Sequence, residues 1–439
     1  MNVKIHPSRF ISENKFLGSK SLTHRFLLAC FLANNSSIID NIAENDDIDA
    51  TMSFFKAIGV EIIYTSKHSC YLKPLVDYKM KDVIYIDANS SASTLRFLLP
   101  LALNFASKVI FNCSDSLIRR SIETYQNLTE QCNLSIKTIN NQIICSGKIS
   151  LDYYEIEANI SSQFVTGLII NALYQKKATT IKIKGILESK SYVLMTVYVF
   201  KQFGFDIDFD DINNTIYVYK SNNISWDEYF IEGDYSSSSN LIVLACLNGS
   251  LIARNIFKDS IQPDYKIVEL LKNIGGNIYF VNENNRDYLV ALNSNLISKG
   301  IAKQLKCFDI NVQDCIDLAP ILMVLACFSQ GTSYIRNVNR LVYKESDRLK
   351  AMLDNLKLLN VDVRYENNVV SITGKKQYFN NVELNSYNDH RIAMALSVFA
   401  LLNNGLITIK DVECVSKSYP SFYDDLINGC KTGSIEIIK

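Results

Sequence analysis

Two kinds of apolar pattern alternate along the 439-residue chain. Stretches of about 14 residues with apolar side chains at i, i+3 or i+4, and i+7 predict helices, and shorter alternating runs predict strands. One combination recurs about six times: a cluster of small polar residues, a helical stretch, a polar turn, and a strand ending in Asn, Gly or Asp. The copies begin at Ser19, Ser90, Ser161, Ser236, Asp314 and Asn388. The chain is therefore built from internal repeats.

A second helix and strand follow in several copies. Each has helical spacing, a Lys near the end of the helix, a Gly or Asn turn and an alternating run. The clearest examples cover residues 47–64, 192–209, 264–280 and 346–365. The repeating unit is therefore β-α-β-α-β-β, and its short connections and continuous apolar strands favour an α/β protein over an array of helices alone.

The polar cluster at the head of each repeat has a physical meaning of its own. Ser, Thr, Asp and Asn are preferred N-caps, and a helix N-terminus offers free N–H groups at the positive end of its dipole. Capping alone accounts for any single cluster. Six symmetrically packed copies would place equivalent helix ends together, which predicts a surface that attracts phosphorylated or carboxylated small molecules.

The composition narrows the class of protein further. The 45 Lys and Arg residues equal the 45 Asp and Glu residues, so the basic excess expected for nucleic-acid binding is absent. The 11 cysteines are scattered without a CxxC pair, and the four His residues form no HExxH motif. We therefore expect buried, reduced thiols and no dedicated metal site.

Apolar segments of membrane-spanning length are not found in the sequence. Residues 241–247 and 321–328 are among the longest apolar runs, and both are too short to cross a bilayer. The first 16 residues contain no apolar core of signal-peptide length and no small-residue cleavage site. The expected location is the cytoplasm.

Cations stand at predicted helix starts, where the helix dipole disfavours positive charge. Lys20 and Arg25 lie in the first turns of the first helix, and Arg391 lies in the first turn of a later one. Solvated charges are the ordinary explanation for such residues, but a bound anion explains this placement better. Neither a Walker loop nor GxGxxG occurs, so purine nucleotides are not indicated.

The segment from Arg340 to Arg348 is the richest in charged residues. On a helix that begins near Ser346, Lys344 and Glu345 occupy the entering loop and Arg348 the first turn. A capped helix with an ordinary ion pair would explain this segment if it stood alone. Elsewhere, Lys417 stands on a loop bounded by Pro420, and Asp317 lies in an apolar segment, where its pKa is expected to be perturbed.

The motifs GSKSLTHR, SSQF, SKSY, EGDYSSSS, YKESDRL, NDHRIAMA and SKSYP follow one another along nearly the whole chain. In this order and spacing they resemble the 5-enolpyruvylshikimate-3-phosphate synthase family. The resemblance implies a two-domain enolpyruvyl-transferase fold of six βαβαββ units, three per domain, with helix N-termini facing the interdomain cleft. One domain would span residues 20–234 and the other residues 1–19 plus 235–439, with crossovers near 18–20 and 234–236.

The resemblance also implies a reaction. The carboxyvinyl group of phosphoenolpyruvate passes to the 5-hydroxyl of shikimate 3-phosphate, phosphate is released by addition and elimination, and the product serves chorismate and aromatic amino acid biosynthesis. No metal or organic cofactor is implied, and the expected enzyme is a monomer. The residues implied for shikimate 3-phosphate are Lys20, Ser21, Arg25, Ser161, Ser162, Gln163, Ser189, Asp317 and Lys344. Those implied for phosphoenolpyruvate are Lys20, Ala92, Arg120, Gln163, Arg348, Arg391 and Lys417.

Proton transfer is implied at two atoms, the attacking hydroxyl and the methylene carbon of phosphoenolpyruvate. Two carboxylates in different environments suit this task, because their pKa values can be separated. The resemblance assigns Asp317 to the hydroxyl and, less directly, Glu345 to the methylene carbon. Lys20 would offset the charge that develops during addition.

Two alternatives stay open at this point. The UDP-N-acetylglucosamine 1-carboxyvinyltransferases share the fold and the donor, but they begin their first motif GxKN and use a reactive loop Cys; the nearest loop thiol here is Cys113. A non-catalytic paralogue would keep the fold without turnover, although it would have no reason to retain all the charged residues of the site.

One position departs from the family pattern. The loop before Arg96 usually reads Asn-x-Gly-Thr, whereas this chain has Ser90-Ser91-Ala92-Ser93, which places Ala92 where the Gly backbone lies against phosphoenolpyruvate. Close approach of backbone to a ligand is a common reason for Gly. The added methyl group predicts weak inhibition by glyphosate, a longer competitor of phosphoenolpyruvate, unless the loop backbone shifts outwards.

Overall fold

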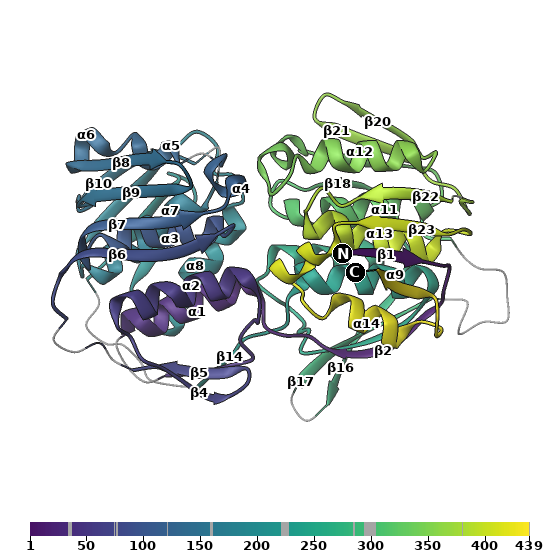
Figure 1. Cartoon of the computed structure of the whole chain (residues 1–439), viewed down its shortest axis with the longest axis horizontal. Helices are drawn as coiled ribbons and strands as arrows, with labels where there is room; N and C mark the ends of the chain where they lie inside the picture. Colours follow the sequence, from purple (N-terminus) through teal and green to yellow (C-terminus); the bar gives the residue numbers. More distant parts are fainter. Residues whose placement is uncertain are drawn as a thin grey trace. The chain divides into compact units, whose positions relative to one another are not determined.

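The computed structural model describes residues 1–33, 37–73, 75, 78–120, 122–158, 161–220, 228–283, 286–293, 304–379 and 381–438. They form two compact units. The central unit is Gly18–Ile231, and the terminal unit combines Met1–Leu17 with Glu232–Lys439. Figure 1 shows this division by colour, because the purple strands β1 and β2 belong to the same unit as the green and yellow elements.

The central unit contains three four-stranded sheets, with strand orders β14-β3-β5-β4, β6-β7-β9-β8 and β10-β11-β13-β12. Its strands are β3 (Ile38–Asp40), β4 (Ile62–Ser66), β5 (Ser69–Leu72), β6 (Lys81–Asn89), β7 (Ala106–Cys113), β8 (Leu134–Ile139), β9 (Gln142–Gly147), β10 (Tyr153–Glu157), β11 (Thr179–Lys184), β12 (Ile207–Asp210), β13 (Thr215–Val218) and β14 (Glu228–Phe230). Its helices are α1 (Lys20–Ala33), α2 (Asp46–Ile58), α3 (Ala92–Ala102), α4 (Asp115–Ile118), α5 (Glu123–Gln126), α6 (Thr129–Cys132), α7 (Gln163–Tyr174) and α8 (Lys190–Gln202).

The terminal unit also contains three four-stranded sheets, with orders β16-β17-β15-β2, β18-β19-β21-β20 and β22-β23-β1-β24. Its strands are β1 (Asn2–Ile5), β2 (Phe10–Lys15), β15 (Gly249–Arg254), β16 (Asn277–Glu283), β17 (Arg286–Leu292), β18 (Asp309–Asn311), β19 (Thr332–Arg336), β20 (Asp362–Glu366), β21 (Val369–Thr373), β22 (Val382–Asn385), β23 (Ile407–Lys410) and β24 (Ile435–Ile438). Its α-helices are α9 (Tyr235–Asn248), α10 (Lys266–Asn273), α11 (Ala319–Phe328), α12 (Arg348–Leu358), α13 (His390–Leu402) and α14 (Phe422–Gly429). Its 3₁₀ helices are Pro263–Tyr265, Ile316–Leu318, Asn339–Tyr343 and Val412–Lys417.

All six sheets share one topology. From one edge of each sheet, the first two strands are parallel, and the third and fourth strands each run antiparallel to the strand before them, as in β10-β11-β13-β12. A parallel pair needs a crossover, and a helix such as α7 supplies it. Three sheets are completed by strands from distant parts of the chain: β14 pairs with β3, β2 with β15, and β1 with β23 and β24. The predicted sixfold β-α-β-α-β-β repeat is thus present.

The second half of the repeat varies. The four stretches with clear helical periodicity contain α2, α8, α10 and α12. The second repeat instead has three short helices, α4 to α6, and the sixth has a 3₁₀ helix followed by α14. The helix expected near Ser346 is α12, which begins at Arg348 with Asp347 as its N-cap, so Arg348 lies in its first turn. One local expectation needs correction: Lys417 ends a 3₁₀ helix rather than lying on an open loop.

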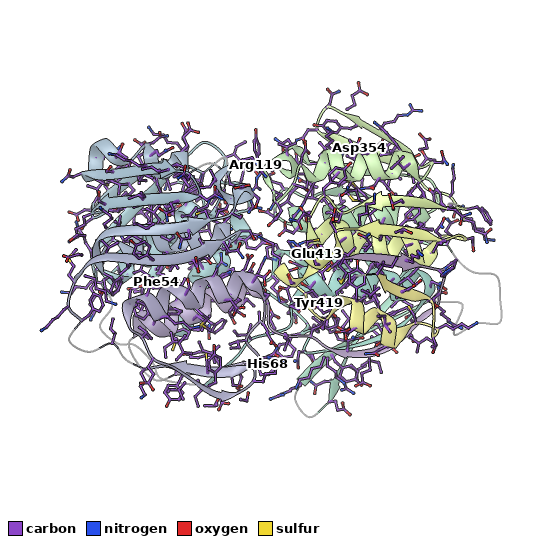
Figure 2. The ribbon with its side chains drawn as sticks, viewed as in Figure 1. Phe54, His68, Arg119, Asp354, Glu413 and Tyr419 are labelled. Carbon is purple, nitrogen blue, oxygen red and sulfur yellow. The ribbon has the colours of Figure 1, made fainter. Side chains whose placement is uncertain are left out.

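Most helices at the repeat heads are buried on all sides, which explains their weak amphipathic pattern. All ten residues of α11 are buried. In the central unit, Phe54 (labelled in Figure 2) lies edge-on to Phe31 and Phe105, with ring centroids 6.0 and 5.8 Å apart. None of the helices in the described ranges is long and apolar enough to cross a membrane.

The cysteines are free thiols, as predicted. Eight are buried, Cys414 and Cys430 are half-buried, and Cys307 is exposed. The expectation of burial was therefore wrong for Cys307. Within the residues that the structure describes, no group of three or more His, Cys, Asp or Glu side chains is arranged to hold a metal ion.

Close helix packing in the central unit depends on Gly167. A Cβ at this position of α7 would lie 2.2 Å from the Tyr125 hydroxyl and 2.3 Å from the Arg96 carbonyl oxygen of α3. Tyr125 donates a hydrogen bond to that carbonyl at 2.6 Å. Gly167 therefore lets α7 approach α3, and this contact brings the first residues of the two helices together.

Candidate active site

The N-terminal turns of five helices meet in the central unit. Arg25 of α1 contacts Tyr192 and Thr196 of α8. Gln163, the first residue of α7, contacts the start of α3. Thr51, in the second turn of α2, lies 2.8 Å from His24 of α1 and 2.9 Å from Thr94 of α3. The N-terminal parts of these helices, and so the positive ends of their dipoles, therefore lie together. The polar clusters pointed to the repeat-head helices α1, α3 and α7, and the structure adds α2 and α8.

Lys20 is the first residue of α1, and its ammonium group is largely buried. Its Nζ lies 2.8 Å from Oδ2 of Asp47, with 14% and 6% of the two side chains exposed. Asp47 lies in the first turn of α2, where its charge is favourable. Asp47 was not singled out from the sequence, although acidic residues in a first helical turn are a recognisable signal.

Arg25 is held in a fixed orientation. Its Nε donates to Thr196 Oγ1 at 2.8 Å, Nη1 to the Ser21 carbonyl at 2.7 Å, and Nη2 to the Tyr192 carbonyl at 3.0 Å. Burial lowers the pKa of Arg25 to about 10, so the guanidinium stays charged at neutral pH. These bonds use three of its five N–H groups, and they fix the fork before any ligand binds.

The predicted serines and the glutamine lie at helix starts. Ser161 and Ser162 are buried immediately before α7, and Ser189, also buried, precedes α8 in the left-handed conformation (φ 54°). Gln163 donates to Ser93 Oγ at 2.9 Å and accepts from Arg96 Nη1 at 2.9 Å. Its amide therefore links α7 to the turn that carries Ala92.

Two further predicted residues of the central unit lie at the ends of loops. Ala92 is the first residue of α3, with Ser91 as N-cap, and it is 7% exposed. Arg120 follows the short helix α4, and its backbone N–H donates to the Leu117 carbonyl at 3.0 Å. Arg120 is half-buried.

Arg348 is the most strongly anchored cation of the terminal unit. It is 1% exposed and bonds three carboxylates: Nε to Asp389 at 2.8 Å, Nη1 to Asp317 at 2.8 Å, and Nη2 to Glu345 at 2.5 Å. Asp389 is the N-cap of α13 and also accepts from the backbone N–H of Arg391 at 2.9 Å. The sequence motif included Asp389, but its role in holding Arg348 was not predicted.

Asp317 is surrounded by cations. Lys344 Nζ lies 3.0 Å from Oδ1, and Arg391 Nη2 lies 3.6 Å from Oδ2. Burial alone would raise the pKa of Asp317, but Lys344, Arg391 and Arg348 together hold it well below its usual range. Asp317 is therefore an ionised carboxylate at neutral pH and can accept a hydrogen bond or a proton.

Arg391 has unused binding capacity. It is 4% exposed, and its Nε and Nη1 have no hydrogen-bond partner among the residues that the structure describes. A buried guanidinium with unsatisfied N–H groups is unfavourable unless an anion binds there. Lys417 Nζ lies 3.8 Å from Oε1 of Glu345, the carboxylate that Arg348 also binds. The turn after Lys417 is fixed by Tyr419 (labelled in Figure 2), whose hydroxyl donates to Asp425 at 2.6 Å.

Asp264 was not singled out from the sequence. It lies in the 3₁₀ helix before α10, is 1% exposed, and accepts a hydrogen bond from the Ser236 hydroxyl. Its Oδ1 has no hydrogen-bond partner within the described part of the chain. Burial and the nearby charge of Asp317 raise the pKa of Asp264 to about 7, and Arg391 opposes the rise.

The predicted residues divide between the two units. Those of the central unit are Lys20, Ser21, Arg25, Ala92, Arg120, Ser161, Ser162, Gln163 and Ser189, and hydrogen bonds join Gln163 to the turn of Ala92 and Arg25 to Ser21. The cluster of the terminal unit contains Asp317, Lys344, Glu345, Arg348, Arg391 and Lys417. In this cluster Lys344, Arg348, Arg391 and Lys417 bring four cations together, and the N–H groups of Arg391 that lack a partner in the part of the chain that the structure describes suit the binding of an anionic ligand.

Comparison with solved structures identifies the class of fold. EPSP synthase from Acinetobacter baumannii has a TM-score of 0.80 at 21% sequence identity, with 100% of both chains covered. The enolpyruvyl transferase NikO from Streptomyces tendae has a TM-score of 0.72 at 15% identity, covering 99% of this chain and 98% of that one. The fold is that of the enolpyruvyl transferases, which confirms the predicted fold class.

Sequence comparison identifies the family. The profile of EPSP synthase (3-phosphoshikimate 1-carboxyvinyltransferase) matches residues 6–426. Relatives called 3-phosphoshikimate 1-carboxyvinyltransferase from Clostridium novyi and Clostridium acetobutylicum are each 34% identical, over 434 and 429 residues. Each alignment covers 97% of this chain and 96% of the relative. The chain belongs to the EPSP synthase family.

Proposed function

We propose that this enzyme transfers the carboxyvinyl group of phosphoenolpyruvate to the 5-hydroxyl of shikimate 3-phosphate and releases phosphate. Family membership supports the reaction. The observation that carries it to the site is the buried Arg391, whose Nε and Nη1 lack a partner among the described residues beside the carboxylate of Asp317. This pair offers an anion-binding fork next to a proton acceptor, which a substrate with phosphate, carboxylate and hydroxyl groups requires.

In the terminal unit, Arg348, Arg391 and Lys417 are proposed to hold phosphoenolpyruvate, and Lys344 to hold shikimate 3-phosphate. Bidentate contacts from an arginine fork suit a carboxylate or a phosphate. Arg348 already binds three carboxylates, so it contributes mainly by fixing Asp317 and Glu345 in place. Arg391 then provides the stronger direct contact.

In the central unit, the residues proposed to hold shikimate 3-phosphate are Lys20, Ser21, Arg25, Ser161, Ser162, Gln163 and Ser189. Those proposed to contact phosphoenolpyruvate are Lys20, Ala92, Arg120 and Gln163. Helix N-termini, buried hydroxyls and a preoriented Arg25 fork all favour an anionic ligand with several hydroxyl groups. Lys20 is proposed to stabilise the charge that develops during addition.

The chemistry proceeds by addition and elimination. The 5-oxygen bonds to C2 of phosphoenolpyruvate while its proton leaves and C3 gains a proton; C3 then loses a proton as the bond from C2 to the phosphate oxygen breaks. We assign the hydroxyl proton to Asp317 and the C3 proton to Glu345. Both carboxylates lie within ion-pair distance of cations, at 2.8 Å for Asp317 and 2.5 Å for Glu345. A bound anion that neutralises those cations raises the proton affinity of the carboxylates, which prepares them for transfer.

The alternative acceptor, UDP-N-acetylglucosamine, is not favoured. The enzymes that use it need a reactive loop thiolate, and Cys113 is 6% exposed. Burial raises the pKa of Cys113 to about 12, so its thiolate is scarce at neutral pH.

The enzyme is further proposed to be a cytoplasmic monomer that needs neither a cofactor nor nucleic acid. The direct test is phosphate release from phosphoenolpyruvate in the presence of shikimate 3-phosphate, with light scattering on the same sample to measure the oligomeric state. An enzyme that releases no phosphate with this acceptor would contradict the proposed reaction.

A further inference from the structure

A line of hydrogen bonds runs through the interior of the central unit, from α1 through α2 to the start of α3. His24 Nδ1 lies 2.8 Å from Thr51 Oγ1, and Thr51 Oγ1 lies 2.9 Å from Thr94 Oγ1. Thr94 Oγ1 in turn donates to Ser91 Oγ at 2.9 Å. All four side chains are at most 1% exposed. Such a connected set of buried polar groups fixes the relative positions of the helices that carry it.

The line ends at the turn that contains Ala92. Ser91 is the N-cap of α3: its Oγ accepts from the Thr94 backbone N–H at 3.3 Å, and its own N–H donates to the Ala88 carbonyl at 2.8 Å. On the other side of Ala92, Ser93 Oγ accepts from Gln163 at 2.9 Å. Hydrogen bonds therefore hold both neighbours of Ala92.

The tautomer of His24 decides the direction of these hydrogen bonds. His24 Nε2 has no hydrogen-bond partner within the described ranges of the chain, so a proton on Nδ1 is the arrangement that leaves no buried ring N–H without an acceptor. Thr51 then accepts from His24 Nδ1 and donates to Thr94, whose own hydroxyl hydrogen goes to Ser91 Oγ or to the Asp47 carbonyl oxygen, 3.3 Å away. Burial lowers the pKa of His24 to about 3. The ring is thus neutral at pH 7, with its proton on Nδ1.

We propose that His24, Thr51 and Thr94 are positioning residues that hold the Ser91–Ala92–Ser93 turn in the geometry that phosphoenolpyruvate binding requires. The inference rests on the proposed function, because it assigns the turn to the donor substrate. The residues act only through the backbone and the N-cap of α3. Their loss should therefore weaken binding of phosphoenolpyruvate more than binding of shikimate 3-phosphate.

Steady-state kinetics of Thr51→Val and Thr51→Ser test the proposal. Thr51→Val keeps the volume but removes the hydroxyl, which leaves His24 and Thr94 without their shared partner. We expect KM for phosphoenolpyruvate to rise about 5-fold, the usual scale for loss of one buried hydrogen bond. KM for shikimate 3-phosphate should change less than about 2-fold, and Thr51→Ser should restore the wild-type value for both substrates.

Thr166→Val is the matched control. Thr166 is a fully buried threonine of the same unit, and its hydroxyl lies 3.1 Å from that of Thr196, so its hydrogen bond is separate from the line that joins His24 to Ser91. Its replacement should leave KM for phosphoenolpyruvate unchanged. An unchanged KM for phosphoenolpyruvate in Thr51→Val, or an equal rise in Thr166→Val, overturns the proposal.

Two measurements do not depend on turnover. ¹⁵N-histidine spectra of the wild-type protein at pH 7 should show His24 as the neutral Nδ1–H tautomer; an Nε2–H tautomer or a titration near the ordinary pKa overturns the assignment. Amide hydrogen exchange at Thr94 and Leu95 should be faster in Thr51→Val than in Thr51→Ser, and equal exchange rates overturn the proposal.

If Thr51→Val does not fold, His24→Leu is measured in its place, with the same expected outcomes. A wild-type enzyme without phosphate release contradicts the proposed function alone, because the spectra and exchange rates still decide the role of His24 and Thr51.

Discussion

Replacement of Asp264 by Asn should raise the free energy of unfolding relative to the wild type, and this gain should be larger at high pH than at low pH. Asp264 is 1% exposed and has one carboxylate oxygen without a partner among the described residues. Burial and the charge of Asp317 raise its pKa from 3.8 to about 7. Between about pH 4 and pH 7, the carboxyl group of Asp264 is therefore protonated in the folded state but ionised in the unfolded state. Within that window stability falls as pH rises, and above it the full penalty is present.

The size of the effect follows from the shift. About three pKa units at about 1.36 kcal/mol per unit give roughly 4 kcal/mol as the full penalty of ionising Asp264 in the folded protein. At pH 5 about a third of this penalty is already present, so roughly 2.5 kcal/mol remains to appear between pH 5 and pH 8. Asn is neutral at both pH values, and its side-chain carbonyl can still accept the hydrogen bond from Ser236. The variant should thus gain about 2.5 kcal/mol on the wild type over this range.

Urea unfolding of both proteins at pH 5 and pH 8, followed by circular dichroism, measures this gain. The contributions of titrating groups far from Asp264 cancel in the difference between variant and wild type. Asp314→Asn, which replaces an exposed carboxylate, is the control and should show no gain. A difference between Asp264→Asn and wild type that is the same at both pH values, or that decreases as pH rises, would refute the assignment of a buried acid with a raised pKa.

Three substitutions test the proposed roles in the site. Glu345→Gln should lower kcat by about 10² to 10⁴ with little change in KM, because it removes a proton-transfer group; near-full turnover would remove Glu345 from the mechanism. Arg391→Ala should raise KM for phosphoenolpyruvate about 10- to 100-fold through the lost charge-assisted bonds, and an unchanged KM would contradict the proposed contact. Ala92→Gly should bind glyphosate more tightly than the wild type, because the bonded neighbours Ser91 and Ser93 prevent the turn from shifting away; equal inhibition constants would show that the methyl group does not clash.

Elements with a strong local signal were predictable from the sequence. Helices α2, α8, α10 and α12 each carry helical periodicity and a Gly or Asn after their last turn, and all four form where that pattern lies. Arg391 could be placed in the first turn of a helix, because Asp389 precedes it as an N-cap. Residues 115–132 lack such periodicity, and the structure has three short helices there.

Properties that depend on tertiary packing could not be predicted. The pairing of β14 with β3 and of β1 with β23 joins segments far apart in the sequence, and no local pattern encodes it. Asp264 follows a Pro near a helix start, where an exposed acid is the ordinary expectation; only the fold shows that it is buried beside Ser236. The hydrogen bonds that join His24, Thr51, Thr94 and Ser91 likewise could not be predicted, because the four residues belong to three helices that meet only in the folded protein.

The central claim is the reaction itself, and the acceptor dependence of phosphate release tests it most directly. Purified enzyme is mixed with phosphoenolpyruvate and either shikimate 3-phosphate or UDP-N-acetylglucosamine, and inorganic phosphate is measured over time. Phosphate release that requires shikimate 3-phosphate, is absent with the nucleotide sugar, and falls sharply in Glu345→Gln is the predicted result. Release with UDP-N-acetylglucosamine, or with neither acceptor, would contradict it.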